Sequence, residues 1–348
     1  MKRKSITIGF TLALIASFFY STPANATDII GSGSSFAANF IDRCRVEYVK
    51  SDAGSVNYTA TGSGAGKTML YNGLSDFAMS DVPYSSSEQK PNKEFLYVPL
   101  VAGPIAIVYK LDKYPTTIKM STDTLAKVFA GQITKWNDEQ ILKENMVNGK
   151  KPKIPAITIT VVYRADGSGT SEVFTSYLNA VSPIIWNKTG NKSFSNTFPG
   201  DITQNIMFQS ANGSQGVAML QGITNGSIGY NEVSYARGLK TVSVKNAAGI
   251  YKQPTVSAAA AFLGDFVSSP DGTVKVNYNN KNKLAYNIST FTYGIAFKEK
   301  NEVNDSVKKF FTFMVDTCGK KAEDLGYSPL TGNMLKFSKA RIDEISSK

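Results

Sequence analysis

The chain has 348 residues, of which 42% are apolar and 19% charged, and its formal net charge is +11. This composition is that of ordinary globular domains, two at about 150 residues each, and excludes a disordered or collagen-like chain. The sequence has no histidine and only two cysteines, which excludes Ser-His-Asp and Cys-His nucleophile systems, histidine-ligated metal sites, zinc thiolate clusters and iron–sulfur centres.

The first 26 residues have the features of a secretory signal peptide. Basic residues at 2–4 precede an apolar stretch at 6–19, and Ala-Asn-Ala at 24–26 offers a small-residue cleavage site. We therefore expect cleavage after Ala26 and export of the mature chain. No later stretch is apolar over the roughly 18 residues that a membrane span requires, so we expect a soluble product.

Strand-like apolar runs alternate with amphipathic helical segments along the rest of the chain. The predicted strands lie at 55–60, 95–110, 157–163 and 290–297. The predicted helices lie at 36–50, 67–74, 122–129, 171–181 and 305–318. This alternation predicts an α/β fold with largely parallel sheets.

Three loops rich in glycine and serine stand before predicted helices, at 31–35, 62–66 and 167–171. At such a turn the first backbone N–H groups of the helix lack partners and the helix dipole is positive. Glycine lets a ligand approach the backbone closely, and hydroxyl groups add donors. One such loop is equally typical of a plain helix cap, but three in one chain predict an anion held by helix N-termini.

An arginine and two acidic residues complete this pattern. Arg164-Ala-Asp166 leads into the third loop, and a guanidinium can grip an oxyanion through two charged hydrogen bonds of about 1.5–3 kcal/mol each. Asp166 could orient Arg164. Asp81 ends a short apolar run, and a carboxylate suits an anion site only if the anion has a proton to donate. The alternatives are that Asp81 caps a turn and that Arg164 and Asp166 form a surface pair.

The two cysteines each lie on the apolar face of a predicted helix, Cys44 in the first and Cys318 at the end of the last. An exported protein can form a disulfide. The sequence leaves a Cys44–Cys318 bridge and two buried free thiols both open.

Four motifs occur in a characteristic order: Gly31-Ser-Gly-Ser-Ser-Phe36, Gly62-Ser63, Ser80-Asp81-Val-Pro83 and Arg164-Ala-Asp-Gly-Ser-Gly-Thr170. Together they resemble the periplasmic phosphate-binding proteins of ABC-type phosphate importers, over essentially the whole mature chain. The resemblance implies a type II periplasmic-binding-protein fold, with two α/β domains and a ligand cleft between them. It implies that domain I comprises 27–99 plus 288–348 and that domain II comprises 100–287.

The resemblance also implies a phosphate site and no catalytic residue, cofactor or metal. The implied phosphate contacts are Ser34, Ser35, Phe36 through its backbone N–H, Ser63, Asp81, Arg164, Ser168, Gly169 and Thr170. Asp81 would accept the proton of phosphate, and Asp166 would support Arg164. Because sulfate carries no proton at neutral pH, a buried Asp81 would exclude it.

This chain departs from the usual pattern of the family in its first two loops. Ser35 stands where threonine is usual, Ala37 stands where proline is usual, and Gly64-Ala-Gly66 is atypical. Serine keeps the hydroxyl group, so the expected ligand stays the same.

The resemblance implies a monomer in the periplasm that delivers phosphate to the permease subunits of an ABC importer and, through them, to its cytoplasmic ATPase. We expect no nucleic-acid partner, because the lysines are scattered rather than clustered.

An exported serine hydrolase of the penicillin-recognising type is the alternative function. Ser87-Glu-Gln-Lys90 and Lys188-Thr-Gly190 mimic two of its motifs, but no Ser-Asp-Asn motif stands between them. Pro91 also disfavours a helix through Lys90. Residues 61–68 nearly match a nucleotide-binding P-loop, although Thr61 replaces its first glycine.

Overall fold

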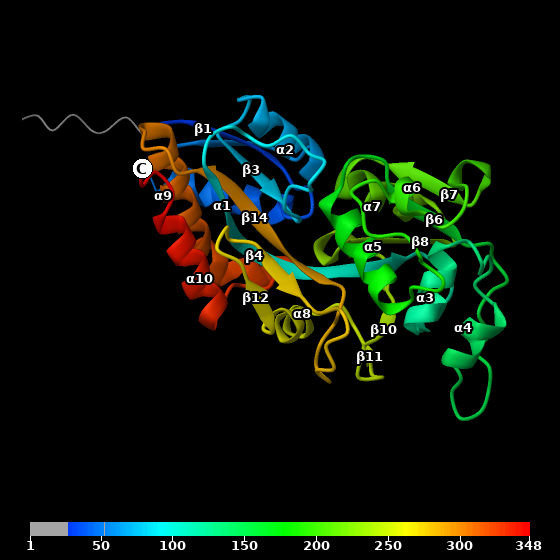
Figure 1. Cartoon of the computed structure of the whole chain (residues 1–348). Coiled ribbons are helices and arrows are strands. Elements are labelled where there is room, and N and C mark those ends of the chain that lie inside the picture. Colours follow the sequence, from blue (N-terminus) through cyan, green and yellow to red (C-terminus); the bar gives the residue numbers. More distant parts are fainter. Residues whose placement is uncertain (1–26, 52) are drawn as a thin grey trace, which may run out of the picture.

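The computed structural model describes residues 27–51 and 53–348 (Figure 1). The predicted signal peptide and its cleavage site lie outside the described residues. Over the described ranges, no helix combines the length and apolar character that crossing a membrane requires.

Two lobes lie side by side and are joined by long strands (Figure 1). The first lobe is built on β1 (Ile29–Gly33), β2 (Val56–Thr59) and β3 (Phe77–Ser80), with α1 (Ala38–Lys50), α2 (Ser63–Tyr71), α9 (Glu302–Asp316) and α10 (Gly332–Asp343). The second lobe is built on β6 (Thr160–Arg164), β7 (Phe208–Ala211) and β8 (Ser227–Glu232), with α3 (Thr122–Phe129), α4 (Glu139–Glu144), α5 (Gly169–Val181), α6 (Phe194–Thr197) and α7 (Gly213–Ile223).

One sheet runs through both lobes in the order β2-β1-β3-β14-β4-β8-β6-β7, and β9 (Lys240–Thr241) pairs with β4. The joining strands are β4 (Phe95–Tyr109) and β14 (Ser289–Phe297). The β1 and β6 ladders are parallel, as predicted, but β4 and β14 run antiparallel to their neighbours. The prediction of largely parallel sheets is therefore wrong at the centre, because β4 carries the chain into the second lobe and β14 carries it back.

Smaller elements complete the described structure. A second sheet combines β5 (Lys119–Met120), β10 (Ser243–Lys245) and β11 (Tyr251–Lys252), and a hairpin combines β12 (Phe266–Ser268) and β13 (Val274–Val276). The remaining helices are α8 (Val256–Leu263) and the 3₁₀ segments η1 (Ile202–Gln204), η2 (Val233–Ala236) and η3 (Cys318–Leu325). The predicted α/β fold is confirmed.

The helix α2 begins at Ser63, four residues before its predicted start at Lys67. Its first turn therefore contains the glycines that the sequence placed in a loop. A Cβ on Gly66 would lie 2.3 Å from the Cα of Gly33, so only glycine lets the backbone of α2 pack on the end of β1. Close helix–strand packing, which sequence periodicity does not register, explains this difference.

The predicted domain boundaries remain a prediction. The β12–β13 hairpin is relevant to these boundaries. Its residues are predicted to belong to domain II, but the hairpin packs on the strands that join the lobes. The backbone N–H of Tyr97 in β4 donates to the carbonyl of Asp271 at 3.0 Å, and the backbone N–H of Val274 donates to the hydroxyl of Tyr293 in β14 at 3.1 Å.

The two cysteines form a disulfide in this structure. Cys44 in α1 is joined to Cys318 at the start of η3, across 274 residues of sequence, and both side chains are buried. The bond ties the N-terminal helix to the C-terminal helical layer of the same lobe.

Replacing both cysteines (Cys44→Ser with Cys318→Ser) is expected to lower the free energy of unfolding by about 2–5 kcal/mol, because the unfolded chain loses a long-range cross-link. Urea unfolding of the oxidised parent and of the double variant measures the difference. Ligand affinity should stay the same, and an unchanged urea midpoint would contradict a structural role for the bond.

Candidate functional site

The three glycine turns, which are far apart in the sequence, meet at the junction of the lobes. The N–H of Gly62 donates to the carbonyl of Gly33 at 2.8 Å, and the N–H of Gly64 donates to the carbonyl of Gly167 at 2.8 Å. A Cβ on Gly169 would lie 2.6 Å from Ser63 Oγ. The turns therefore form one cluster, in which the second is in contact with both of the others.

Asp81 lies at the centre of this cluster, directly after β3, and is only 3% exposed. Its Oδ1 accepts hydrogen bonds from Ser34 Oγ at 2.6 Å and from Thr292 Oγ1 at 2.8 Å. Its Oδ2 accepts one from Thr170 Oγ1 at 3.0 Å. Burial raises the pKa of the Asp81 carboxyl above its ordinary value, against the opposing effects of the three hydroxyl groups and the Arg164 charge.

Ser63 also contacts Asp81, through its backbone. The hydroxyl oxygen of Ser63 accepts the N–H of Asp81 at 3.3 Å. Since that oxygen is the acceptor of this bond, the hydroxyl hydrogen of Ser63 remains available as a donor.

Arg164, at the end of β6, is 3% exposed and is held by Asp166. Its Nε donates to Asp166 Oδ1 at 2.7 Å, and its Nη2 donates to Asp166 Oδ2. Asp166 also accepts the backbone N–H of Gly213 at 2.9 Å. Burial opposes ionisation of Asp166, but the bonds and the charge of Arg164, together with backbone N–H donors such as that of Gly213, outweigh it and lower the pKa of this carboxyl. Arg164 is buried and the Asp166 side chain is only 17% exposed, so the surface-pair interpretation is wrong.

The turn before α1 and the first residues of α5 supply backbone donors to the cluster. Within residues 27–51 and 53–348, the N–H groups of Phe36, Gly169 and Thr170 have no hydrogen-bond acceptor. Ser168 acts differently, because its N–H donates to the carbonyl of Lys192 at 3.0 Å and its hydroxyl accepts the N–H of Ser171 at 3.1 Å as the N-cap of α5. Ser168 thus shapes the turn and keeps only its hydroxyl hydrogen for a ligand.

A fourth glycine–serine turn joins the cluster and was missed in the sequence. Gly213-Ser214 begins α7, one residue after the end of β7. The backbone N–H of Ser214 donates to Ser35 Oγ at 3.0 Å, and the two hydroxyl groups are 3.1 Å apart. Ser35 therefore contacts the second lobe. The signal was present as Ala211-Asn-Gly-Ser214, which repeats the strand-to-helix pattern of the other turns.

A charge cluster crosses the lobe junction beside the third turn. Glu88, in the loop between β3 and β4, forms ion pairs with Lys67 of α2 and with Lys192 of the second lobe, both at 2.7 Å. The Lys67 side chain is 2% exposed. Burial opposes ionisation of Glu88, but the two ammonium groups outweigh it and hold its pKa at about 2. The Glu88–Lys192 pair therefore links the two lobes at neutral pH.

Replacing Lys192 with methionine is expected to weaken ligand binding by up to about fivefold, because a partly exposed ion pair contributes at most about 1 kcal/mol. The loss should be largest at low salt, since salt screens the pair in the parent. Titrations at low and high salt measure it. Lys93→Met is the matched control, because Lys93 pairs with Glu299 at 2.6 Å away from the cluster. Equal affinities of parent and Lys192→Met at both salt levels would contradict a linking role.

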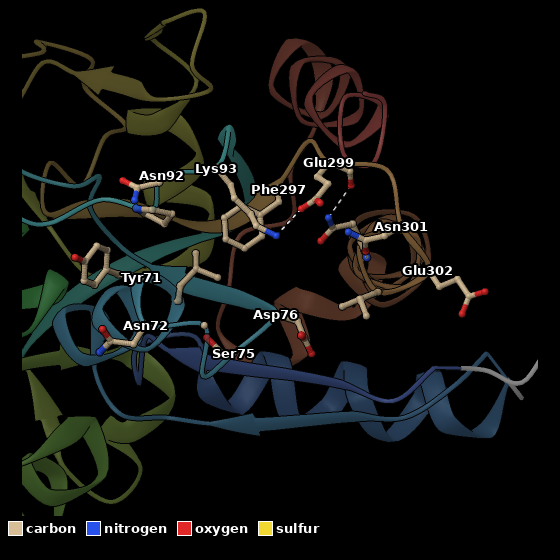
Figure 2. A pocket seen from close by; sticks show the side chains of 15 residues that line it. Tyr71, Asn72, Ser75, Asp76, Asn92, Lys93, Phe297, Glu299, Asn301 and Glu302 are labelled. Atoms are coloured by element: carbon tan, nitrogen blue, oxygen red, sulfur yellow. Dashed lines mark hydrogen bonds and ion pairs between the residues drawn. The ribbon is translucent and has the colours of Figure 1, made fainter.

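A separate groove of about 870 Å³ lies on the first lobe, between the end of α2 and the start of α9. Figure 2 shows Tyr71 and Asn72 on one side of it and the Lys93–Glu299 pair on the other. The residues that line it include none of the cluster residues described above. In the described ranges, no group of three or more His, Cys, Asp or Glu side chains could hold a metal ion.

Ser87, the nucleophile of the alternative hydrolase function, lies outside the cluster. It is exposed, and its hydroxyl contacts the hydroxyl of Ser85 at 3.1 Å. Its neighbour Glu88 is paired with Lys67 and Lys192. The surroundings of Ser87 therefore give no support to a buried, base-activated nucleophile.

Comparisons with known proteins bear on the fold. The structure of a high affinity periplasmic phosphate-binding protein, PfluDING, bound with phosphate is similar with a TM-score of 0.73 and 23% identity, covering 90% of this chain and 93% of that chain. A phosphate-binding protein from Stenotrophomonas maltophilia is similar with a TM-score of 0.67 and 19% identity, covering 90% and 93%. These likenesses support the predicted periplasmic-binding-protein fold.

Sequence comparisons bear on the family. A family model described as a PBP superfamily domain matches residues 20–317. Phosphate-binding protein PstS3 of Mycobacterium bovis is 31% identical over 319 residues, which are 86% of this chain and 81% of that protein. Phosphate-binding protein PstS of Xylella fastidiosa is 29% identical over 314 residues, covering 88% and 83%. The chain therefore belongs to the PBP superfamily and, within it, to the family of the PstS phosphate-binding proteins.

Proposed function

We propose that this protein binds inorganic phosphate in the periplasm, selectively over sulfate, and delivers it to an ABC-type importer. The observation that carries the proposal is the position of Asp81. Its buried carboxylate stands among glycine turns that carry backbone and hydroxyl donors, and the other carboxylate of the cluster, Asp166, is already paired with Arg164. Such an acceptor favours an anion that brings its own proton.

The selectivity follows from the protons on the two anions. Phosphate at neutral pH keeps at least one proton, which can be donated to Asp81, whereas sulfate has none. Sulfate in this position would set an anion oxygen against an anionic carboxylate, both withdrawn from water. Unpaired buried groups of this kind give discrimination of about 10⁴–10⁵.

The proposed phosphate contacts come from both lobes. The N–H groups of Phe36, Gly169 and Thr170 and the guanidinium of Arg164 neutralise the anion. Hydroxyl donors come from Ser35, Ser63 and Ser168. Ser34 and Asp166 act mainly on Asp81 and Arg164, with which they are hydrogen-bonded.

The proposed transport role is that of a binding protein without catalytic activity. Domain I (27–99 plus 288–348) and domain II (100–287) would close around phosphate about β4 and β14, and the closed form would be the state that the membrane permease accepts. The cytoplasmic ATPase would then power import. The protein would act as a monomer without a cofactor, after removal of residues 1–26. The names of its PstS relatives as phosphate-binding proteins support this role.

Calorimetric titration of the mature chain, residues 27–348, tests the proposal. Phosphate is expected to bind with one site per chain, and sulfate at the same ionic strength is expected to give no saturable heat at concentrations far above the phosphate Kd. Equal affinities for the two anions, or no phosphate binding, would overturn it. Turnover of a chromogenic β-lactam, lost in a Ser87→Ala variant, would instead favour the hydrolase.

A further inference from the structure

The two oxygens of the Asp81 carboxylate are in different surroundings. A carboxylate oxygen has two lone pairs and so accepts about two hydrogen bonds. Oδ1 already accepts two, from Ser34 and from Thr292. In the described part of the chain, Oδ2 accepts one, from Thr170. The remaining acceptor position of this carboxylate is therefore on Oδ2.

The two donors to Oδ1 are held by the framework of the fold. Ser34 directly follows β1, and its backbone N–H is bonded to the carbonyl of Met79 in β3 at 2.7 Å. Thr292 lies within β14, opposite Val101 of β4, and is fully buried. Both donors therefore approach Oδ1 from positions fixed by the sheet, one within a strand and one at the end of a strand, and they fix the rotation of the carboxylate.

We propose that Ser34 and Thr292 occupy Oδ1 so that Oδ2 is the oxygen that accepts the proton of bound phosphate, and that Thr292 is thereby a positioning residue for selectivity against sulfate. This inference rests on the proposed function and adds to it a residue outside the glycine turns. Thr292 acts through Asp81, because its hydrogen bond keeps the carboxylate ionised and turned toward the anion.

The charged and titratable groups around Asp81 set the sign of the expected effect. Arg164 favours the ionised carboxylate, and the charge of ionised Asp81 adds to the effect of burial in raising the pKa of the nearby Tyr58 hydroxyl. Removing the Thr292 hydroxyl takes away a donor that stabilises the ionised form. A larger share of molecules then carries neutral Asp81 in mild acid, where it can donate to a sulfate oxygen instead of repelling it.

The test compares Thr292→Val with Thr290→Val. Thr290 lies in the same strand, is also buried, and bonds only backbone carbonyls, that of Phe291 at 3.1 Å and that of Asp81 at 3.4 Å. Both substitutions remove one buried hydroxyl group, but only the first removes a donor to the carboxylate. The phosphate Kd and the sulfate Kd, the latter from competition, are measured at pH 6 and at pH 8.5 with constant ionic strength.

Thr292→Val is expected to lower the ratio of phosphate to sulfate affinity by about tenfold or more at pH 6, as loss of one hydrogen bond to a charged group predicts, and by less at pH 8.5. Thr292→Ser should recover the parent ratio, and Thr290→Val should keep it. If the parent is selective for phosphate, an unchanged phosphate-to-sulfate affinity ratio in Thr292→Val would overturn the inference. An equal fall of this ratio in Thr290→Val would overturn it as well. Absence of phosphate binding by the parent would instead overturn the proposed function.

Discussion

Asp81→Asn is expected to let the protein bind sulfate, lowering the ratio of phosphate to sulfate affinity by about a hundredfold or more. An amide is uncharged and can donate a hydrogen bond to an oxygen of either anion, so the repulsion that excludes sulfate disappears. A buried polar group of this kind can give a preference for phosphate over sulfate of about 10⁴–10⁵, and most of this preference should be lost in the variant. Competition between the two anions measures the ratio.

The unfolding temperature is the control that shows whether the Asp81→Asn variant is correctly folded. Because burial raises the pKa of Asp81 in the folded chain, the folded state holds that proton more tightly than the unfolded state does. The contribution of this proton to the free energy of unfolding is therefore present at low pH and is lost as the pH rises through the raised pKa. At neutral pH the parent bears the cost of a buried carboxylate, which Asp81→Asn removes. The variant should therefore unfold at a temperature no lower than that of the parent.

Asp76→Asn is the matched substitution for the binding measurement, since Asp76 stands at the other end of β3 and bonds the N–H of Ile30 at 2.7 Å. It should keep the parent selectivity. A parent-like ratio of phosphate to sulfate affinity in Asp81→Asn would show that the carboxylate does not select the ligand by accepting its proton.

Arg164→Met is expected to weaken phosphate binding by about 10²–10⁴-fold. Two charged hydrogen bonds of about 1.5–3 kcal/mol each would be lost, and Asp166 would be left as an uncompensated carboxylate beside the anion. Arg164→Lys keeps the charge without the planar fork and should lie between the parent and Arg164→Met. Titration with phosphate gives the three dissociation constants.

The control for Arg164 is Arg45→Met, which removes an exposed arginine that pairs with Asp42 at 2.7 Å on the surface of α1. Its phosphate affinity should equal that of the parent. Phosphate binding by Arg164→Met within a few-fold of the parent would mean that this guanidinium supports Asp166 and the third turn without holding the ligand.

Short-range signals in the sequence predicted much of the cluster. A glycine–serine turn between a strand and a helix is local, so the turns at 31–35, 62–66 and 167–171 could be identified without knowing the fold. Asp81 and Arg164 stand out for the same reason, since each ends an apolar run. The structure adds that these turns touch one another, as in the bond from Gly64 to Gly167.

Residues that act through distant contacts could not be predicted in this way. Thr292 lies in an apolar run that is typical of a core strand, and its bond to Asp81 spans 211 residues. Lys192 lies in a loop with no motif of its own, and only the fold brings it to Glu88. The early start of α2 likewise depends on the contact of Gly66 with Gly33. Each depends on which strands become neighbours, which local patterns do not specify.

A high-resolution crystal structure of the mature protein grown with phosphate tests the central claim most directly. We predict a single phosphate between the turns, bonded to the N–H groups of Phe36, Gly169 and Thr170 and to Arg164, with one oxygen within hydrogen-bond distance of Asp81 Oδ2. A phosphate bound elsewhere, or one that contacts the turns while Asp81 faces away from it, would contradict the account of how this protein recognises its anion.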